Sequence, residues 1–201
     1  MTHRGIILDR DGTLIDFHRD PELGAVVSAF HPDHLRFLPG VLEGLRALRD
    51  AGFVLAVATN QPGAAKGQIP VEAIHRTNRA LVDRLAAEGI VIAAVAVCLH
   101  QPAGGPGGDP ALAVPCACRK PAPGMLLDLV RQLDLDAAAS WMIGDGTVDV
   151  EAARGAGMRA GLLLDTRRCE LCPIKDAAER CAGADRAAAR FDVLVGEILA
   201  G

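Results

Sequence analysis

The sequence has few aromatic residues, and it lacks the long segments that mark membrane proteins and nucleic-acid-binding proteins. Phe, Trp and Tyr together make up 3% of the 201 residues, so alanine and the branched aliphatic residues must fill most of the core. No apolar run approaches the ~20 residues of a membrane span. The net charge is −4, with no long run of basic residues, which argues against a nucleic-acid partner. We therefore expect neither a membrane nor a nucleic acid as a partner.

Signals for export and for a disulfide framework are also missing. The first expected strand begins at residue 5, which leaves no room for a signal peptide before it. Three of the six cysteines fall in a metal-binding pattern, which suits a reducing compartment better than a disulfide scaffold. We expect a cytoplasmic monomer, and 201 residues are enough for one domain with a proper core.

Apolar runs that alternate with amphipathic segments predict an α/β fold. Strands are expected near 5–9, 53–59, 91–98, 140–145 and 160–165, and helices near 40–51, 70–88, 122–133 and 147–156. This alternation is typical of a parallel sheet with helices on both faces, a three-layer Rossmann-like arrangement. We expect a single domain over 1–201, with a tail and a helix over 166–201.

Two carboxylates stand directly after the first expected strand. Residues 5–8 are continuously apolar, as in a strand that is covered on both faces, and Asp9 and Asp11 follow them. The carboxyl ends of strands are where α/β sheets place their ligands. Crowded carboxylates repel one another unless a cation joins them, and Mg²⁺ prefers oxygen ligands. The alternative is an Asp-rich turn with no ligand.

Three further segments place polar residues where a phosphoryl group could be held. Thr59 and Asn60 end an apolar run and could donate hydrogen bonds to phosphoryl oxygens, or could simply begin a turn. Arg119 and Lys120 are adjacent cations that suit a dianion, although such pairs also occur on solvated surfaces. Asp145 follows another short strand, from which it could reach the same metal.

A second cluster has the residue types of a zinc site. Cys98 and His100 form a C-x-H pair, and Cys116 and Cys118 form a C-x-C pair. Three thiols and one imidazole can close a tetrahedral Zn²⁺ site with no position left for water. The glycine-rich residues 104–108 cannot form a core element, so a metal would hold this loop in place. Free thiols are the alternative.

Four segments in this order, LDRDGTLI, ATNQ, CRKP and IGDGTVD, resemble the motifs of the haloacid dehalogenase (HAD) superfamily of phosphohydrolases. Within it, DRDGT, TNQ and CRKP look like the small bacterial phosphatases that act on heptose bisphosphate or histidinol phosphate. The resemblance implies a HAD-like fold with a minimal cap and a zinc-binding loop over 98–118.

The resemblance also implies roles for the site residues. Asp9 would attack phosphorus to give an aspartyl-phosphate, and Asp11 would serve as acid and then as base. Thr59, Arg119 and Lys120 would stabilise the phosphoryl oxygens. Further residues are expected to bind the substrate: Asn60, Gln61, Arg19 and Lys66.

Mg²⁺ would be bound by Asp9, the backbone carbonyl of Asp11, and Asp145. Asp149 either caps the next helix or takes part in catalysis. Gly146 is a departure from the pattern, because the heptose phosphatases carry a lysine and the histidinol phosphatases an arginine at this place. That departure removes a cation near the substrate.

The expected substrate is a small phosphorylated sugar, with the 7-phosphate of heptose 1,7-bisphosphate as the group removed. Residues 61–67 and 123–125 look like the heptose branch. The alternative is histidinol phosphate, for which every catalytic residue is shared. A non-catalytic zinc-stabilised binding module is a third interpretation, which the complete catalytic set disfavours. Three thiols of the tail are expected to be free, because a fourth ligand is missing: Cys169, Cys172 and Cys181.

Overall fold

A six-stranded sheet in which every pairing is parallel forms the middle layer of the protein. The structure is a computed structural model that describes residues 2–20, 22, 24–164 and 183–201. The strand order is β5-β4-β1-β6-β7-β8. These strands are β1 Gly5–Leu8, β4 Val54–Asn60, β5 Ala94–Cys98, β6 Trp141–Gly144, β7 Arg159–Leu163 and β8 Arg186–Ala188.

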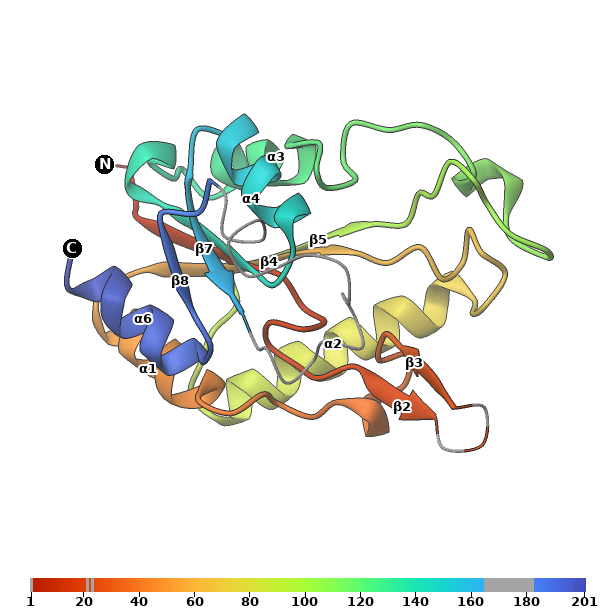
Figure 1. Ribbon diagram of the computed structural model, residues 1–201, viewed down its shortest axis with the longest axis horizontal. Coiled ribbons are helices and arrows are strands. Elements are labelled where there is room, and N and C mark those ends of the chain that lie inside the picture. The colour runs from red at the N-terminus through yellow and green to blue at the C-terminus, as the bar shows by residue number, and fades with distance from the viewer. Residues whose placement is uncertain (1, 21, 23, 165–182) are drawn as a thin grey trace.

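Helices cover both faces of this sheet (Figure 1). Side chains alternate across β1, so Ile6 and Leu8 enter one apolar core and Ile7 enters the other. The first core contains residues of α1 Val41–Asp50, α2 Val71–Ala87 and α6 Phe191–Leu199. The second contains residues of α3 Gly124–Gln132 and α4 Thr147–Gly155. The expected three-layer α/β class is thus confirmed.

The core is built from aliphatic side chains, as the scarcity of aromatic residues predicts. In α1, Val41, Leu45 and Leu48 recur at helical spacing and are all fully buried. Burial of one such side chain contributes about 1.5–3 kcal/mol. Their contacts hold α1 beneath the sheet, so the strands that carry the polar residues have a rigid support.

The sequence-based elements are all present, with ends that differ by a few residues. The largest difference is at β5, which begins at Ala94 rather than at residue 91. Three strands were not expected: β2 His18–Asp20 and β3 Ala25–Val27, which pair as a hairpin, and β8 at the edge of the sheet. Each has only three residues, too few to show a clear alternation. The tail thiols Cys169, Cys172 and Cys181 lie outside the described residues.

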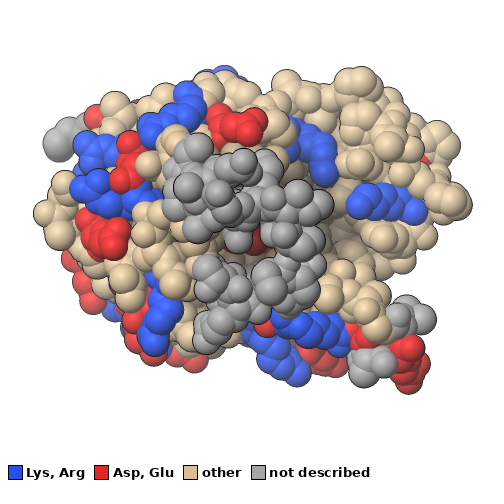
Figure 2. All heavy atoms as spheres, in the orientation of Figure 1, with Lys and Arg blue, Asp and Glu red and all other residues tan. Residues whose placement is uncertain are grey.

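The loop after β5 extends from one end of the molecule (Figure 1) and contains a short 3₁₀ helix, Pro110–Leu112. Residues 99–117 carry one charged side chain, Asp109. On the face shown in Figure 2, basic and acidic side chains are mixed at the opposite end of the molecule and along the lower edge, while the loop end carries few charges. Within the part of the chain that the structure describes, no helix has the length and apolar character needed to cross a membrane.

Candidate active site

The expected site residues converge at the carboxyl ends of three neighbouring strands. Asp9 and Asp11 follow β1, Thr59 lies near the end of β4, and Asp145 follows β6. Because β1 pairs with β4 on one side and with β6 on the other, the three strand ends are adjacent. The Asp9 amide continues the β1–β6 ladder by donating to the carbonyl of Ile143 at 2.9 Å. The sheet order therefore places these residues together.

Lys120 lies at the centre of the site. Its ammonium donates to Asp9 Oδ1 at 2.7 Å, to Asp149 Oδ1 at 2.6 Å and to the Ala58 carbonyl at 2.8 Å. Only 3% of the residue is exposed. Burial alone would lower the pKa of Lys120, but the Asp149 and Asp9 carboxylates raise that pKa well above its ordinary value. The ammonium is therefore a permanent positive charge beside Asp9.

The contact with Lys120 does not fully offset the cost of burying the Asp9 carboxylate. Burial raises the pKa of Asp9 to about 6, while Lys120 acts to lower it and Asp149 and Asp11 add to the rise. A carboxyl group with such a pKa ionises more readily when a further cation is near it. The need for positive charge is thus greatest at the proposed nucleophile.

Asp149 caps α4, which is one of the two roles expected for it, and it also contacts Lys120. Its Oδ2 accepts the amide of Gly146 at 3.1 Å, which caps α4 at its first turn. Its Oδ1 accepts from Lys120, and the residue is buried. One side chain therefore fixes the start of α4 and the position of the central ammonium.

Two glycines allow this close packing of acidic side chains. Gly12 has φ +89, and a Cβ there would lie 2.2 Å from Oδ2 of Asp145. A Cβ on Gly144 would lie 2.2 Å from the carboxyl carbon of Asp149. A side chain at either position would displace an acidic side chain of the site.

Asp11 is held by donors from three directions. Arg10 donates to it through Nε at 3.0 Å and through Nη2 at 3.2 Å. The backbone amide of Ala29 donates to Oδ1 at 3.1 Å, and Gln61 Nε2 donates to Oδ2 at 2.6 Å. Sequence reasoning did not assign a role to Arg10. The available signal was a charged residue between two aspartates in a segment otherwise expected to be buried.

Thr59, Asn60 and Gln61 are also engaged in this network. Thr59 is buried, and its hydroxyl accepts from Gln61 Nε2 at 2.9 Å. The Asn60 amide donates to the Lys120 carbonyl at 3.0 Å and accepts from the Lys120 amide at 3.1 Å. Asn60 therefore ties the end of β4 to the loop that carries Lys120. Contact of Asn60 or Gln61 with a substrate stays a prediction.

Three further cationic residues were expected to act on a substrate: Arg119, Arg19 and Lys66. Arg119 is half-buried and donates to the carbonyl of His100 at 3.2 Å. Arg19 lies on β2, where its guanidinium pairs with Asp16 at 2.9 Å. Lys66 is exposed in the turn after β4. Their roles toward a substrate stay predictions.

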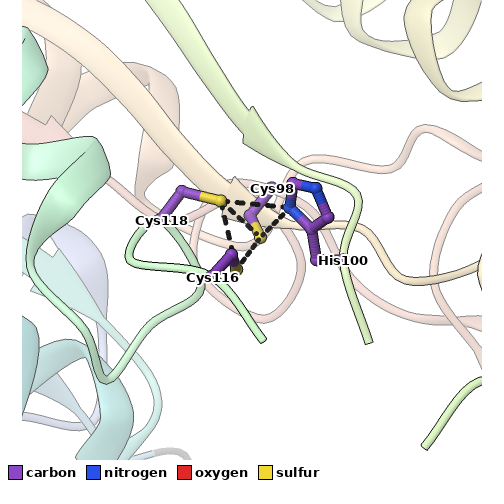
Figure 3. A group of neighbouring side chains, drawn as sticks. All are labelled: Cys98, His100, Cys116 and Cys118. Carbon is purple, nitrogen blue, oxygen red and sulfur yellow. Dashed lines mark hydrogen bonds between the residues drawn. The ribbon is translucent and has the colours of Figure 1, made fainter. Parts of the chain in front are cut away.

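Cys98, His100, Cys116 and Cys118 point toward one another in the structure (Figure 3). The Sγ–Sγ distances from Cys118 are 3.0 Å to Cys98 and 3.3 Å to Cys116, and His100 Nδ1 lies 3.3 Å from Cys118 Sγ. Tetrahedral Zn–S bonds of ≈2.3 Å would set sulfurs roughly 3.8 Å apart, so a small expansion would accommodate the ion. The four donors fit Zn²⁺.

Burial and neighbouring groups shift the pKa values of the three thiols in different directions. Burial raises the pKa of Cys98, and burial together with the other two thiols raises the pKa of Cys118. For Cys116, burial acts to raise the pKa, but the Arg119 amide and the neighbouring thiols lower it overall. Zn²⁺ binds thiolates, so it would offset the repulsion that crowding three of them creates.

The cysteine and histidine cluster adjoins both the end of β4 and the loop that carries Arg119 and Lys120. Cys98 ends β5, beside the end of β4, and Cys118 directly precedes Arg119 and Lys120. The loop between the two pairs packs on the turn after β4, where the Asp109 amide donates to the Ala64 carbonyl at 3.2 Å. The cysteine and histidine cluster thus adjoins the loop that carries Arg119 and Lys120, and the role of zinc in that loop stays a prediction.

The group of aspartates at the strand ends could also hold a metal ion. One carboxylate oxygen each of Asp9, Asp145 and Asp149 lies within 4.8 Å of the others. In the described part of the site, four carboxylates face two buried cations, which leaves two negative charges. The groups are Asp9, Asp11, Asp145, Asp149, Arg10 and Lys120. A divalent cation with a preference for oxygen, such as Mg²⁺, would balance that surplus.

Comparison with known proteins points to one group of enzymes. A family model described as HAD-hydrolase-like matches residues 117–170. The D-glycero-beta-D-manno-heptose-1,7-bisphosphate 7-phosphatase of Yersinia pestis is 35% identical over 162 residues, which cover 80% of each chain. The Escherichia coli K12 enzyme of the same name is 36% identical over 179 residues, covering 88% of this chain and 85% of that enzyme.

A solved structure agrees with these relatives. The D,D-heptose 1,7-bisphosphate phosphatase from B. bronchiseptica, complexed with magnesium and phosphate, superposes with a TM-score of 0.74. It is 29% identical to this chain, and the superposition covers 98% of each protein.

Proposed function

The chain belongs to the HAD family of phosphatases that contains the heptose bisphosphate phosphatases, and from this premise we propose that it removes the 7-phosphate of D-glycero-D-manno-heptose 1,7-bisphosphate. The observation that carries the substrate is the sequence identity to the Yersinia pestis and Escherichia coli enzymes over most of both chains. The chain is accordingly a phosphoric monoester hydrolase. The arrangement of side chains around Lys120 supports the following mechanism for the hydrolysis.

In this proposal Asp9 is the nucleophile. Lys120 holds Oδ1 of its carboxylate at 2.7 Å and so orients the group toward phosphorus. An Asp9 oxygen forms a bond to phosphorus as the bond from phosphorus to the sugar oxygen breaks. The product is an aspartyl-phosphate, which divides one difficult displacement into two easier ones. Water then attacks phosphorus, and the bond to Asp9 breaks to release phosphate.

Asp11 moves the proton in both steps of the proposed reaction. It gives a proton to the sugar oxygen as that oxygen leaves, and it takes a proton from the attacking water in the second step. Gln61 and Arg10 hold its two oxygens in place. A sugar alkoxide is a poor leaving group, so the first proton transfer matters most for the natural substrate.

Positive charge is supplied from several sides. Asp9, the carbonyl of Asp11, and Asp145 would hold Mg²⁺, which supplies neutralisation of the phosphoryl oxygens when bound. Lys120 carries a permanent charge beside Asp9, and Thr59 and Arg119 would donate to the phosphoryl oxygens. The proposed zinc ion would act through structure, because it would fix the loop from which Arg119 and Lys120 project.

The test is turnover of two substrates side by side with Mg²⁺. We expect heptose 1,7-bisphosphate to exceed histidinol phosphate in kcat/KM by at least about tenfold. Phosphorus NMR of the product identifies which phosphate leaves, and we expect loss of the 7-phosphate with the 1-phosphate retained. The matched control is Asp9→Asn, which preserves the size of the side chain. Equal or faster turnover of histidinol phosphate would overturn the substrate assignment.

A further inference from the structure

Among the residues that the structure describes, Arg10 is the largest that is fully buried, and in the sequence it lies between the two aspartates of the proposed reaction. None of its surface is exposed. A buried guanidinium is costly unless each of its donors finds a partner. Every nitrogen of this guanidinium does: Nε and Nη2 bind Asp11, Nη2 also binds the Ala29 carbonyl at 2.9 Å, and Nη1 binds Asn78 Oδ1 at 2.5 Å.

These partners belong to three separate elements. Asp11 is in the loop after β1, Asn78 is on α2, and Ala29 follows the β2–β3 hairpin. Arg10 therefore connects one carboxylate to two supports that are distant in the sequence. Ala29 takes part twice, since its carbonyl accepts from Arg10 and its amide donates to Asp11 Oδ1 at 3.1 Å.

The guanidinium of Arg10 restricts the orientation of the Asp11 carboxylate more than a single donor could. Two nitrogens in one rigid plane contact both of its oxygens, at 3.0 and 3.2 Å. This contact limits rotation of the carboxylate about its own axis. Lysine could supply the charge, but it would supply it from a point on a flexible stem.

We propose that Arg10 is a positioning residue for proton transfer, which acts by fixing the Asp11 carboxylate against α2 and the end of the β2–β3 hairpin. The proposal rests on the proposed role of Asp11 as the acid of the reaction. Removal of Arg10 would free the carboxylate to rotate away from the leaving oxygen. A misplacement of about 1 Å can cost roughly 10²-fold in rate.

Leaving-group chemistry separates positioning from a general loss of structure. A sugar phosphate releases an alkoxide that needs a proton, whereas p-nitrophenyl phosphate releases a stable phenolate that needs none. The value of kcat/KM reports the first chemical step, in which that proton is given. A residue that acts through Asp11 must therefore matter for the sugar phosphate and matter little for the aryl phosphate.

The experiment compares Arg10→Met, Arg10→Lys and Asp11→Asn on both substrates, in the full chain with Mg²⁺. For Arg10→Met we expect kcat/KM to fall at least about 100-fold on the sugar phosphate and less than about tenfold on p-nitrophenyl phosphate. Arg10→Lys should recover part of the loss. Arg10→Met combined with Asp11→Asn should be no slower than Asp11→Asn alone.

The matched control is Leu45→Ala, which changes a fully buried residue of α1 in the first apolar core. It should lower the melting temperature and leave the ratio of the two kcat/KM values unchanged. If Arg10→Met does not fold, Asn78→Ala, which removes one partner of Arg10, tests the same ratio. Equal losses on the two substrates, or additive effects of the Arg10 and Asp11 changes, would overturn the proposal.

The outcome is separable from that of the proposed function. If the wild-type protein hydrolyses another alkyl phosphate faster than heptose 1,7-bisphosphate, the substrate assignment fails, and the ratio is measured on that alkyl phosphate instead. If the ratio is unchanged in Arg10→Met while the wild-type protein prefers the heptose, only the positioning role fails.

Discussion

Replacement of Lys120 by methionine should destabilise the protein strongly and in a pH-dependent manner. The side chain is 2% exposed, and its ammonium lies 2.7 Å from Asp9 and 2.6 Å from Asp149. Methionine keeps most of the volume of the side chain but leaves two buried carboxylates facing one another. Removal of one partner of a buried ion pair costs about 3–5 kcal/mol.

For a chain of this length that loss corresponds to a fall in melting temperature of about 10 °C. The loss should be smaller at pH 5 than at pH 7.5. Burial already raises the pKa of Asp9 to about 6, and removal of the ammonium raises that pKa further. At pH 5 Asp9 then takes up a proton, and the repulsion between the two carboxylates disappears.

Urea unfolding without added Mg²⁺ measures the effect, with elemental zinc determined in parallel to show that the cysteine cluster is unchanged. Lys120→Met combined with Asp149→Asn should regain roughly half of the lost free energy, because it removes one of the opposed charges. The exposed control Lys66→Met should change stability by less than about 0.5 kcal/mol. A loss below about 1 kcal/mol for Lys120→Met, or a double variant less stable than the single one, would refute the reasoning.

Three further outcomes follow from the same geometry. Asp9→Asn should reduce phosphate release more than a hundredfold, because the amide cannot attack phosphorus, while circular dichroism stays unchanged; turnover above that level, with deamidation excluded, would contradict the assignment. Protein purified without chelators should contain close to one Zn²⁺ per chain, and Cys116→Ser should lower both the zinc content and the affinity for phosphate; a preparation free of zinc would count against the site. Mg²⁺ should raise the melting temperature at pH 7.5 and have little effect at pH 5. The folded pKa of Asp9, about 6, lies above its unfolded value, so ionising Asp9 reduces the stability of the metal-free protein as the pH rises toward 6, and Mg²⁺ offsets that loss only once the proton has left.

The order of strands and helices could be predicted from the sequence because apolar and polar segments change sharply along this chain. The apolar run Ile6-Ile7-Leu8 ends at Asp9 with no intermediate residue, so the strand and the polar site are both visible in one segment. The cysteine and histidine cluster was visible for a similar reason, since pairs of metal-binding residue types stand on both sides of a glycine-rich loop. In the structure the four side chains lie within 4.8 Å of one another.

Other features depend on contacts that spacing does not report. The hairpin strand His18–Asp20 is polar and three residues long, so nothing in it alternates. The side-chain amide of Asn60 bonds to the backbone of Lys120, a contact between residues 60 positions apart that spacing does not reveal. Arg10 was overlooked because a guanidinium usually lies on the surface, and its burial follows only from partners on α2 and after β3.

The order of strands in the sheet also has a consequence for biosynthesis. The central strand β1 pairs with β4 on one edge and with β6 on the other. In the pairing with β6, Ile6 lies opposite Trp141. A ribosome adds about 5–20 residues per second, so β1 waits roughly 7–27 s for that neighbour. Throughout this interval one edge of the most apolar strand is unpaired, and Asp145 has not yet been made. Until β6 is made, the nascent chain is therefore most exposed to aggregation at the strand that precedes the proposed nucleophile.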